Sequence, residues 1–529
     1  MADEPPTELL AVLDQALANF GEKAVAYVLD TALGQQPSIE DDPRWEVIRA
    51  LASPIDDVNL APEQRVSLRC HFLSQIISGT GRTYIEVCRA TVGGRLPMLS
   101  GDAIVDSFVR LVFNGLAMEL VSGAEWDRFT ISASFQDPAL CNSAAAAFLQ
   151  DADLKRLFPK ASRAPDERGL VSATSLLTWL PAGGGTTYLG IVIGSFVEQT
   201  LARMRFMDAL AEENIEPFVR ESLDQLRKFA RGDEISVLLL TGLVGIEVDA
   251  PLDRGSWGIR PSDGLAINEL PHTGESRSRS VLWTKTPHRL IGTARADVSE
   301  DQINAMFSEF QERATSFLAE LRRRTMSLQF GLLAWAVESG HDSPINVLAT
   351  SSWSLLPLSQ TQPPFPLSQA GNVHTTRLDA EDLNVVADLV EEVGEVTPRL
   401  DVALSRMIRV GSERRDPVDA LIDAVVAWEN MVGSKAETTF KVCAALAWLL
   451  EPDDEGKRVA LFSKAKKIYA LRSDLVHGSV DADPDLAPEY GQEALAIAVR
   501  AFRRIHADTT LKELKSSSRS DRLLMRSGA

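Results

Sequence analysis

The sequence has little cysteine, no long apolar run and an overall deficit of positive charge. The four cysteines are scattered among 529 residues, and none stands in a CxxC pair or at the spacing of metal ligands. We therefore expect reduced thiols in a cytoplasmic protein, with no metal site and no cofactor. The longest apolar stretch, Tyr188–Val197, is too short to span a bilayer, and the acidic, polar start is not typical of a signal peptide. We expect no membrane association.

Familiar catalytic motifs are also missing. The chain contains no GxSxG, no HExxH and no paired-aspartate loop. Gly183–Thr187 resembles a phosphate-binding loop only superficially, because no Lys-Ser/Thr pair follows it and no strong strand precedes it. We predict a flexible turn at this position.

The charge is unevenly distributed along the chain. A net charge of −20 argues against sequence-blind binding of nucleic acid, because the long-range field repels phosphate. From Lys457 to the end, however, 14 Lys and Arg stand against 9 Asp and Glu, whereas the rest carries 40 against 65. Any contact with nucleic acid is therefore expected in the C-terminal part. The alternative is a solvated basic face followed by a loose tail.

Length and patterning predict a mainly α protein with a small central β-sheet, an α+β arrangement of several units. Apolar residues recur at helical spacing through the first part of the chain, whereas Ile235–Leu240, Leu243–Val248 and Val281–Trp283 are β-prone. We divide the chain into a helical N-terminal region (1–231), a small α+β domain with short antiparallel strands (232–356), a proline-rich linker (357–375), a C-terminal helical bundle (376–510) and a disordered tail (511–529).

The predicted bundle has clear helix boundaries. Asp416-Pro417 is a strong helix start, since Asp caps free N–H groups and Pro fits the first turn. Four apolar-faced helices follow, and they suffice for a compact bundle. The third runs to His477, where Gly478 is the expected left-handed cap residue.

Arg472 and His477 carry the clearest chemical signal of the chain. A histidine can move a proton, and an arginine can stabilise a phosphate that gains negative charge. On an ideal helix, residues five apart lie about 140° apart around the axis and ~7.5 Å along it, so these two side chains do not stack directly. A groove between them is more easily closed by a second copy of the helix across a two-fold axis. Alternatively, Arg472 pairs with a nearby carboxylate such as Asp474 or Glu429, and His477 only complements the last carbonyls of its helix.

Three successive predicted helices carry a resemblance to a known family. The matching residues are Asp416–Asp423 and Ala427–Glu429, then Phe440–Leu446, then Tyr469–Ser473 with His477-Gly478. In this order they resemble the Apea-like HEPN domain, over roughly Leu400–His506. The resemblance implies a four-helix bundle that forms a homodimer, with the Arg and His of both protomers facing a shared cleft. It also implies a metal-independent endoribonuclease that cleaves RNA rather than DNA, acting as a toxin or antiviral defence effector restrained by the N-terminal region.

The resemblance also assigns roles to individual residues. His477 would act as general base or acid on the ribose 2′-OH or the leaving oxygen, and Arg472 would stabilise the phosphorane-like charge. Glu429 would orient one of them. Lys467, Ser473 and Tyr469 are the expected substrate-binding residues: Lys467 would attract RNA, and Tyr469 and Ser473 would contribute from a supporting position at most. Active members of the family usually carry Asn, Asp or His directly after the arginine, where this chain has Ser473. The alternative is a non-catalytic HEPN domain that binds nucleotides or partners.

Overall fold

The computed structural model describes residues 7–35, 37, 42–53, 62–97, 99–121, 138–158, 175–180, 183–262, 280–288, 292–293, 299, 301, 304–305, 308, 326–340, 348–354, 375–394, 398–412, 414, 416–434, 438–478 and 483–525. Of the proline-rich segment predicted as a linker, only residue 375 lies within these ranges. The described chain is mostly helical with small sheets, which confirms the mainly α fold expected from the sequence.

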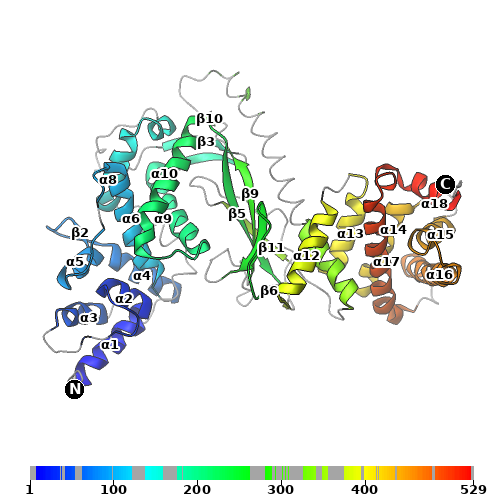
Figure 1. The fold of residues 1–529 in the computed structure, drawn as a ribbon, viewed down its shortest axis with the longest axis horizontal. Helices are drawn as coiled ribbons and strands as arrows, with labels where there is room; N and C mark the ends of the chain where they lie inside the picture. Colours follow the sequence, from blue (N-terminus) through cyan, green and yellow to red (C-terminus); the bar gives the residue numbers. More distant parts are fainter. Residues whose placement is uncertain are drawn as a thin grey trace.

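The molecule is elongated, with N-terminal helices at one end, a sheet in the middle and C-terminal helices at the other end (Figure 1). The N-terminal helices are α1 (Thr7–Phe20), α2 (Glu22–Leu29), α3 (Arg44–Ala52), α4 (Pro62–Ser74), α5 (Tyr84–Thr91), α6 (Ala103–Glu119), α8 (Pro138–Gln150), α9 (Leu189–Phe206) and α10 (Ile215–Arg231), with short 3-10 turns at Leu154–Leu157 and Glu212–Asn214. Helix α6 is buried along most of its length, and its Phe108 ring lies 4.4 Å from the Phe196 ring of α9.

Small hairpins interrupt this helical region. β1 (Ile76–Ile77) pairs with β2 (Arg82–Thr83), and β3 (Ser175–Leu180) pairs with β4 (Gly183–Tyr188) and with β10 (Gly292–Thr293). The prediction of a flexible turn at Gly183–Thr187 is therefore wrong, because these residues lie in β4. Their weak strand propensity is overridden by antiparallel pairing along the whole of β3.

The central sheet is antiparallel, as predicted. Its strands are β5 (Ile235–Val244), β7 (Leu252–Asp253), β8 (Trp257–Pro261), β9 (Ser280–His288) and β11 (Leu348–Ser354), in the order β11-β5-β9-β8-β7. β6 (Ile246–Val248) continues directly from β5 and pairs in parallel with β12 (Thr376–Leu378), which leads into the C-terminal helices.

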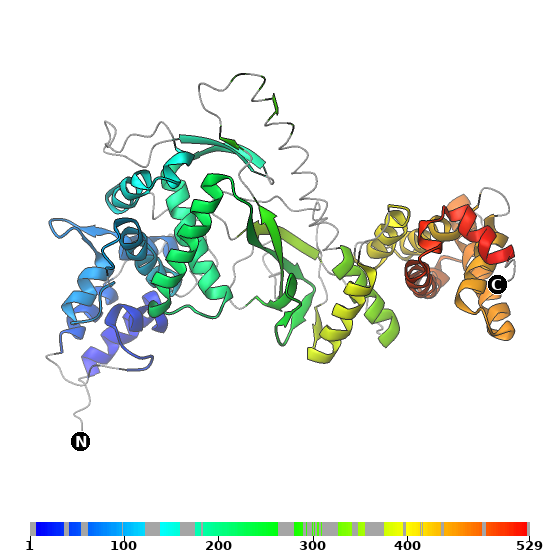
Figure 2. The ribbon, with the colours of Figure 1, turned by 45° about the horizontal axis from the view of Figure 1, so that its top comes forward.

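The C-terminal part contains α12 (Ala380–Val393), α13 (Asp401–Ser412), α14 (Pro417–Val432), α15 (Thr438–Leu450), α16 (Glu455–His477), α17 (Ala487–Ala507) and α18 (Ser516–Met525), with 3-10 turns at Pro484–Leu486 and Leu511–Glu513 (Figure 2). A further helical stretch covers residues 326–339. Helices α14 to α17 correspond to the four predicted from the sequence. Asp416 caps α14 by accepting a hydrogen bond of 2.8 Å from the Val418 amide, as its position before a proline suggests.

Two large hydrophobic cores divide the described residues, and β5 takes part in both. Ile235 and Val237 pack in the N-terminal core, whereas Leu243 packs with residues of the sheet and the C-terminal helices. Between them, Leu240 belongs to a small cluster that includes Phe206 from α9 and Trp283 from β9. The sheet thus shares its core with the C-terminal helices and continues into the N-terminal core.

Residues 511–525 are ordered, although they fall in the segment predicted as a disordered tail. Helix α18 packs against α14 and α15 within residues 511–529. One arginine of this serine- and arginine-rich segment is buried: Arg519 is inaccessible to solvent. Its guanidinium donates hydrogen bonds to the carbonyl oxygens of Leu511 (2.7 Å), Lys512 (3.2 Å) and Met431 (3.0 Å). Arg519 thereby connects α18 to the end of α14 and to the 3-10 turn at Leu511–Glu513, where the Leu511 carbonyl also accepts the Leu514 amide.

Candidate functional site

Helix α16 carries most of the predicted site. It begins at the N-cap Asp454, whose carboxylate accepts the Lys457 amide at 2.9 Å. That hydrogen bond lowers the pKa of the Asp454 carboxyl. The helix ends at Gly478, which has φ +66° and donates its amide to the carbonyls of Asp474 and Leu475. The predicted left-handed cap is confirmed, and His477 is the last helical residue.

Glu429, Tyr469 and Arg472 come together between α14 and α16. The Tyr469 hydroxyl donates a hydrogen bond to Oε1 of Glu429. Nη2 of Arg472 lies 3.7 Å from Oε2 of the same carboxylate, which is an ion pair beyond hydrogen-bond range. The Arg472 guanidinium carbon also lies 6.0 Å from the centre of the Tyr469 ring. The carboxylate of Glu429 therefore lies between the hydroxyl and the guanidinium.

These three groups differ in their access to solvent. The side chains of Arg472 and Glu429 are 18% and 28% exposed, whereas Tyr469 as a whole is 7% exposed. Burial raises the pKa of the Tyr469 phenol, and its hydrogen bond to the negative Glu429 raises it further. The positive charge of Arg472 opposes this shift. Tyr469 is therefore a protonated donor throughout the physiological pH range.

His477 lies on a different side of α16. The His477 side chain is exposed. Val459, which is 57% exposed, lies about five helical turns earlier on the same helix. This spacing places both on the outward face, opposite the buried Ala465 and Ile468. Within one chain, the structure thus places Arg472 against α14 and His477 toward solvent.

The remaining predicted residues are spread over the same helix. Lys467 is exposed and Ser473 is half-buried. Nearby, Lys464 pairs with Glu493 of α17, while Lys466 is exposed. The exposed Lys466 and Lys467 thus lie in the middle of α16, whereas the exposed Asp474 and Val476 stand closest to His477.

Cysteine chemistry is not a competing interpretation. All four cysteines lie within the described ranges, all are buried, and no two of them form a disulfide. Burial raises the pKa of the Cys443 thiol to about 12, although Lys466 opposes the shift. A thiol with this pKa is a poor nucleophile at neutral pH.

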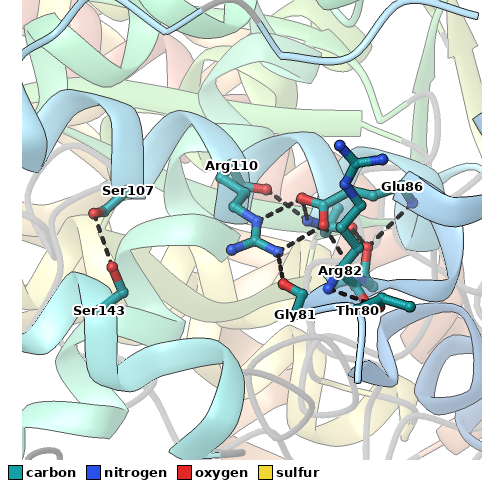
Figure 3. A network of polar contacts seen from close by, with 9 residues as sticks. Thr80, Gly81, Arg82, Glu86, Ser107, Arg110 and Ser143 are labelled. Carbon is teal, nitrogen blue, oxygen red and sulfur yellow. Dashed lines mark hydrogen bonds and ion pairs between the residues drawn. The ribbon is translucent and has the colours of Figure 1, made fainter. Parts of the chain in front are cut away.

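A second polar cluster lies in the N-terminal region. Glu86 accepts the Thr83 amide at 2.9 Å and completes a capping box at the start of α5. Figure 3 shows the Arg110 guanidinium facing this carboxylate, at 2.7 Å from Nη2 to Oε2, and the backbone of Gly81. The charges of Glu86 and Arg110 compensate each other, and the hydrogen bond from Arg110 to Gly81 connects the β1–β2 hairpin to α6. The cluster therefore stabilises the fold. The Thr-x-x-Glu pattern predicts its capping part.

The contact between Tyr469 and Glu429 was not predicted from the sequence. Tyr469 was expected to support the site, and its hydroxyl donates a hydrogen bond directly to Glu429. Glu429 and Tyr469 are 40 residues apart in the sequence and lie on different helices. Only the packing of these helices reveals the contact.

Searches of family models, of curated proteins and of solved structures found no match to this chain. Over the ranges that the structure describes, no group of three or more His, Cys, Asp and Glu side chains is arranged to bind a metal ion. No helix in that part of the chain combines the length and apolarity required to cross a membrane.

Proposed function

We propose that the protein is a metal-independent HEPN endoribonuclease that cleaves RNA through the ribose 2′-OH. The observation that supports this most is the arrangement on α16: an arginine with one long ion pair stands five residues before an exposed histidine at the helix end. An arginine that makes only a long contact with its carboxylate keeps donors for a phosphate. An exposed imidazole can reach a hydroxyl of a bound polymer.

The proposed chemistry uses the two groups in different roles. His477 removes the proton from the 2′-OH, whose oxygen attacks the adjacent phosphorus, and a protonated imidazole returns a proton to the leaving 5′ oxygen. Arg472 stabilises the extra negative charge of the phosphorane-like transition state. Because DNA lacks the 2′-OH nucleophile, the proposed substrate is RNA. Exposed Lys467 adds attraction for the backbone.

The divergence of the two side chains on one helix supports a homodimeric site. Two copies of α16 around a two-fold axis present His477 of one protomer beside Arg472 of the other, which gives the cleft four functional groups. In this proposal the N-terminal region restrains the bundle without abolishing its cleavage at high protein concentration, and a signal releases it, as in a toxin or an antiviral defence effector. The site is cytoplasmic, where RNA is abundant.

The test is cleavage of total RNA by purified protein in EDTA. Wild type is compared with Arg472→Ala and His477→Ala, and with two matched controls: His71→Ala, an exposed histidine in the last turn of α4, and Arg500→Ala, an exposed arginine on α17. We expect cleavage to fall at least about 100-fold in the first two variants and to persist in the controls. Equal cleavage in all five proteins, or none by a dimeric wild type at any protein concentration, would remove the proposal.

One observation favours a second candidate function. Glu429 already compensates the charge of Arg472, as in the alternative where the arginine is an ordinary ion-pair partner. In that case the domain is a non-catalytic HEPN scaffold that binds nucleotides or a partner. Both alanine substitutions would then preserve activity in cells, whereas Val459→Asp on the outward face of α16 would abolish it. Sedimentation velocity on Val459→Asp reports whether assembly is lost.

A further inference from the structure

The Arg472–Glu429 pair belongs to the longer arginine–carboxylate pairs of the described residues, together with Arg414–Asp419 and Arg254–Glu391. Arg227 approaches Asp151 at 2.9 Å, and Arg500 approaches Glu451 at 3.0 Å. The corresponding distance between Arg472 and Glu429 is 3.7 Å, and the two side chains are only partly buried. A second interaction of the carboxylate competes with the guanidinium for it.

Tyr469 supplies that interaction. It stands three residues before Arg472, so the two side chains are neighbours on the same face of α16. The hydroxyl binds Oε1 of Glu429, which leaves only Oε2 directed toward the arginine. The phenol remains a donor because its pKa is raised by burial and by the carboxylate. The aromatic ring also limits where the guanidinium can lie, at 6.0 Å from its centre.

The arginine is left with unused hydrogen-bonding capacity. A guanidinium has five N–H donors. The Nε of Arg472 is buried and has no hydrogen-bond partner among the residues that the structure describes. Buried N–H groups are rarely left unsatisfied, so such a donor beside a partly exposed guanidinium favours an incoming acceptor. A phosphate oxygen has the geometry for it, since Nε and one Nη donate in parallel to two oxygens.

We propose that Tyr469 is a positioning residue that draws Glu429 aside and thereby keeps Arg472 open to a phosphate group. This inference deepens the proposed function, on which its assignment to RNA rests. Without the hydroxyl, Glu429 is released to close onto Arg472 and competes with the phosphate. Tyr469 does not touch the substrate in this scheme and acts only through the carboxylate.

The test is a double-mutant cycle on Tyr469→Phe and Glu429→Gln. The probes are inorganic phosphate and a fully 2′-O-methylated RNA oligonucleotide, which cannot be cleaved through its 2′ position. We expect Tyr469→Phe to weaken binding of both probes about tenfold, and Glu429→Gln to strengthen it or leave it unchanged. The double variant should recover wild-type affinity, because no competing charge remains. Tyr490→Phe, at a half-buried tyrosine of α17, is the matched control and should bind as wild type does.

A second measurement separates positioning from simple structural damage. The Nε–H resonance of Arg472, assigned by comparison with Arg472→Lys, should shift in Tyr469→Phe and return toward its wild-type position in the double variant. Unchanged affinity and an unchanged Nε–H signal in Tyr469→Phe would overturn the inference even if the protein cleaves RNA. A weakened Tyr469→Phe that Glu429→Gln does not rescue would overturn it as well. If phosphate binding follows the cycle but no RNA is cut, the inference stands and the nuclease proposal fails.

Discussion

The indole N–H of Trp428 donates a hydrogen bond of 3.0 Å to the backbone carbonyl of Ala494. Trp428 is inaccessible to solvent, and the bond joins α14 to α17 at the residue just before Glu429. The position of the Glu429 carboxylate therefore depends on how firmly these two helices are packed.

Trp428→Phe should destabilise the bundle by about 2–3 kcal/mol, because it removes a buried hydrogen bond and leaves a small cavity. Urea unfolding followed by circular dichroism measures the change. Trp448→Phe, on α15 at a half-buried position, is the control and should cost less than half as much. An equal loss of unfolding free energy in the two variants would show that the hydrogen bond from Trp428 to Ala494 does not stabilise the bundle.

Gly478→Ala should destabilise α16 by about 1 kcal/mol, since alanine disfavours the left-handed backbone with φ +66°. No atom lies within 4 Å of an added Cβ there, so the cost is conformational rather than steric. Gly456→Ala, in the first turn of the same helix, is the opposite case and should be neutral or slightly stabilising. Hydrogen exchange of the amides preceding His477 would report the fraying directly.

Arg519→Met should detach α18, because it removes three hydrogen bonds to backbone carbonyl oxygens; the expected cost is about 3 kcal/mol. Burial lowers the pKa of Arg519 to about 10, so the group is still charged at neutral pH. Limited proteolysis should cut the variant within residues 511–525 before any other site. Arg522→Ala, at an exposed position on the same helix, should resist the protease as wild type does.

His506 gives the protein a pH-dependent stability. Burial lowers the pKa of this imidazole from its ordinary value, and the nearby Lys512 charge lowers it further, while contacts with Val393 and Glu392 oppose the shift. The native state therefore holds the neutral ring, which stacks on Phe502 with centroids 5.9 Å apart. Because the unfolded chain binds the proton more readily, the contribution is complete above the unfolded pKa of about 6.5 and is lost as pH falls toward the folded value.

The measurement for His506 is the melting temperature between pH 7.5 and pH 5. In His506→Gln the melting temperature should fall less with decreasing pH than it does in wild type. In His71→Gln, at an exposed position, it should fall as in wild type. A wild-type slope that persists unchanged in His506→Gln would assign the effect to other groups.

Local signals in the sequence predicted the helix boundaries well. Asp416 before Pro417 and Gly478 after His477 act through their own backbone neighbours, so the sequence alone is sufficient to place them. The β4 strand was not predictable in this way, because its glycines are paired through β3 and their own strand propensity is weak. Arg519 was misjudged for a similar reason: its acceptor at Met431 lies 88 residues away.

For the site, the sequence identified the residue types and their helix but not their partners. The spacing of Arg472 and His477 at a helix end identified both as candidates. The roughly 140° between them on an ideal helix agrees with the different environments of their side chains. The Tyr469–Glu429 contact depends on the packing of α14 against α16, which no local pattern encodes. The assignment of RNA cleavage stays a prediction.

The path of β5 limits how this chain can be divided for experiments. Only Gly232–Glu234 separate the end of α10 from the strand, and the strand passes from one large core to the other within ten residues. A truncation placed at this connection would remove Ile235 and Val237 from the N-terminal fragment, expose there the core surface on which they pack, and leave the two side chains without that core on the other fragment. Separate expression of the two halves is therefore expected to give insoluble material unless both are co-produced, and complementation of the two fragments would serve as a sensitive assay of their mutual affinity.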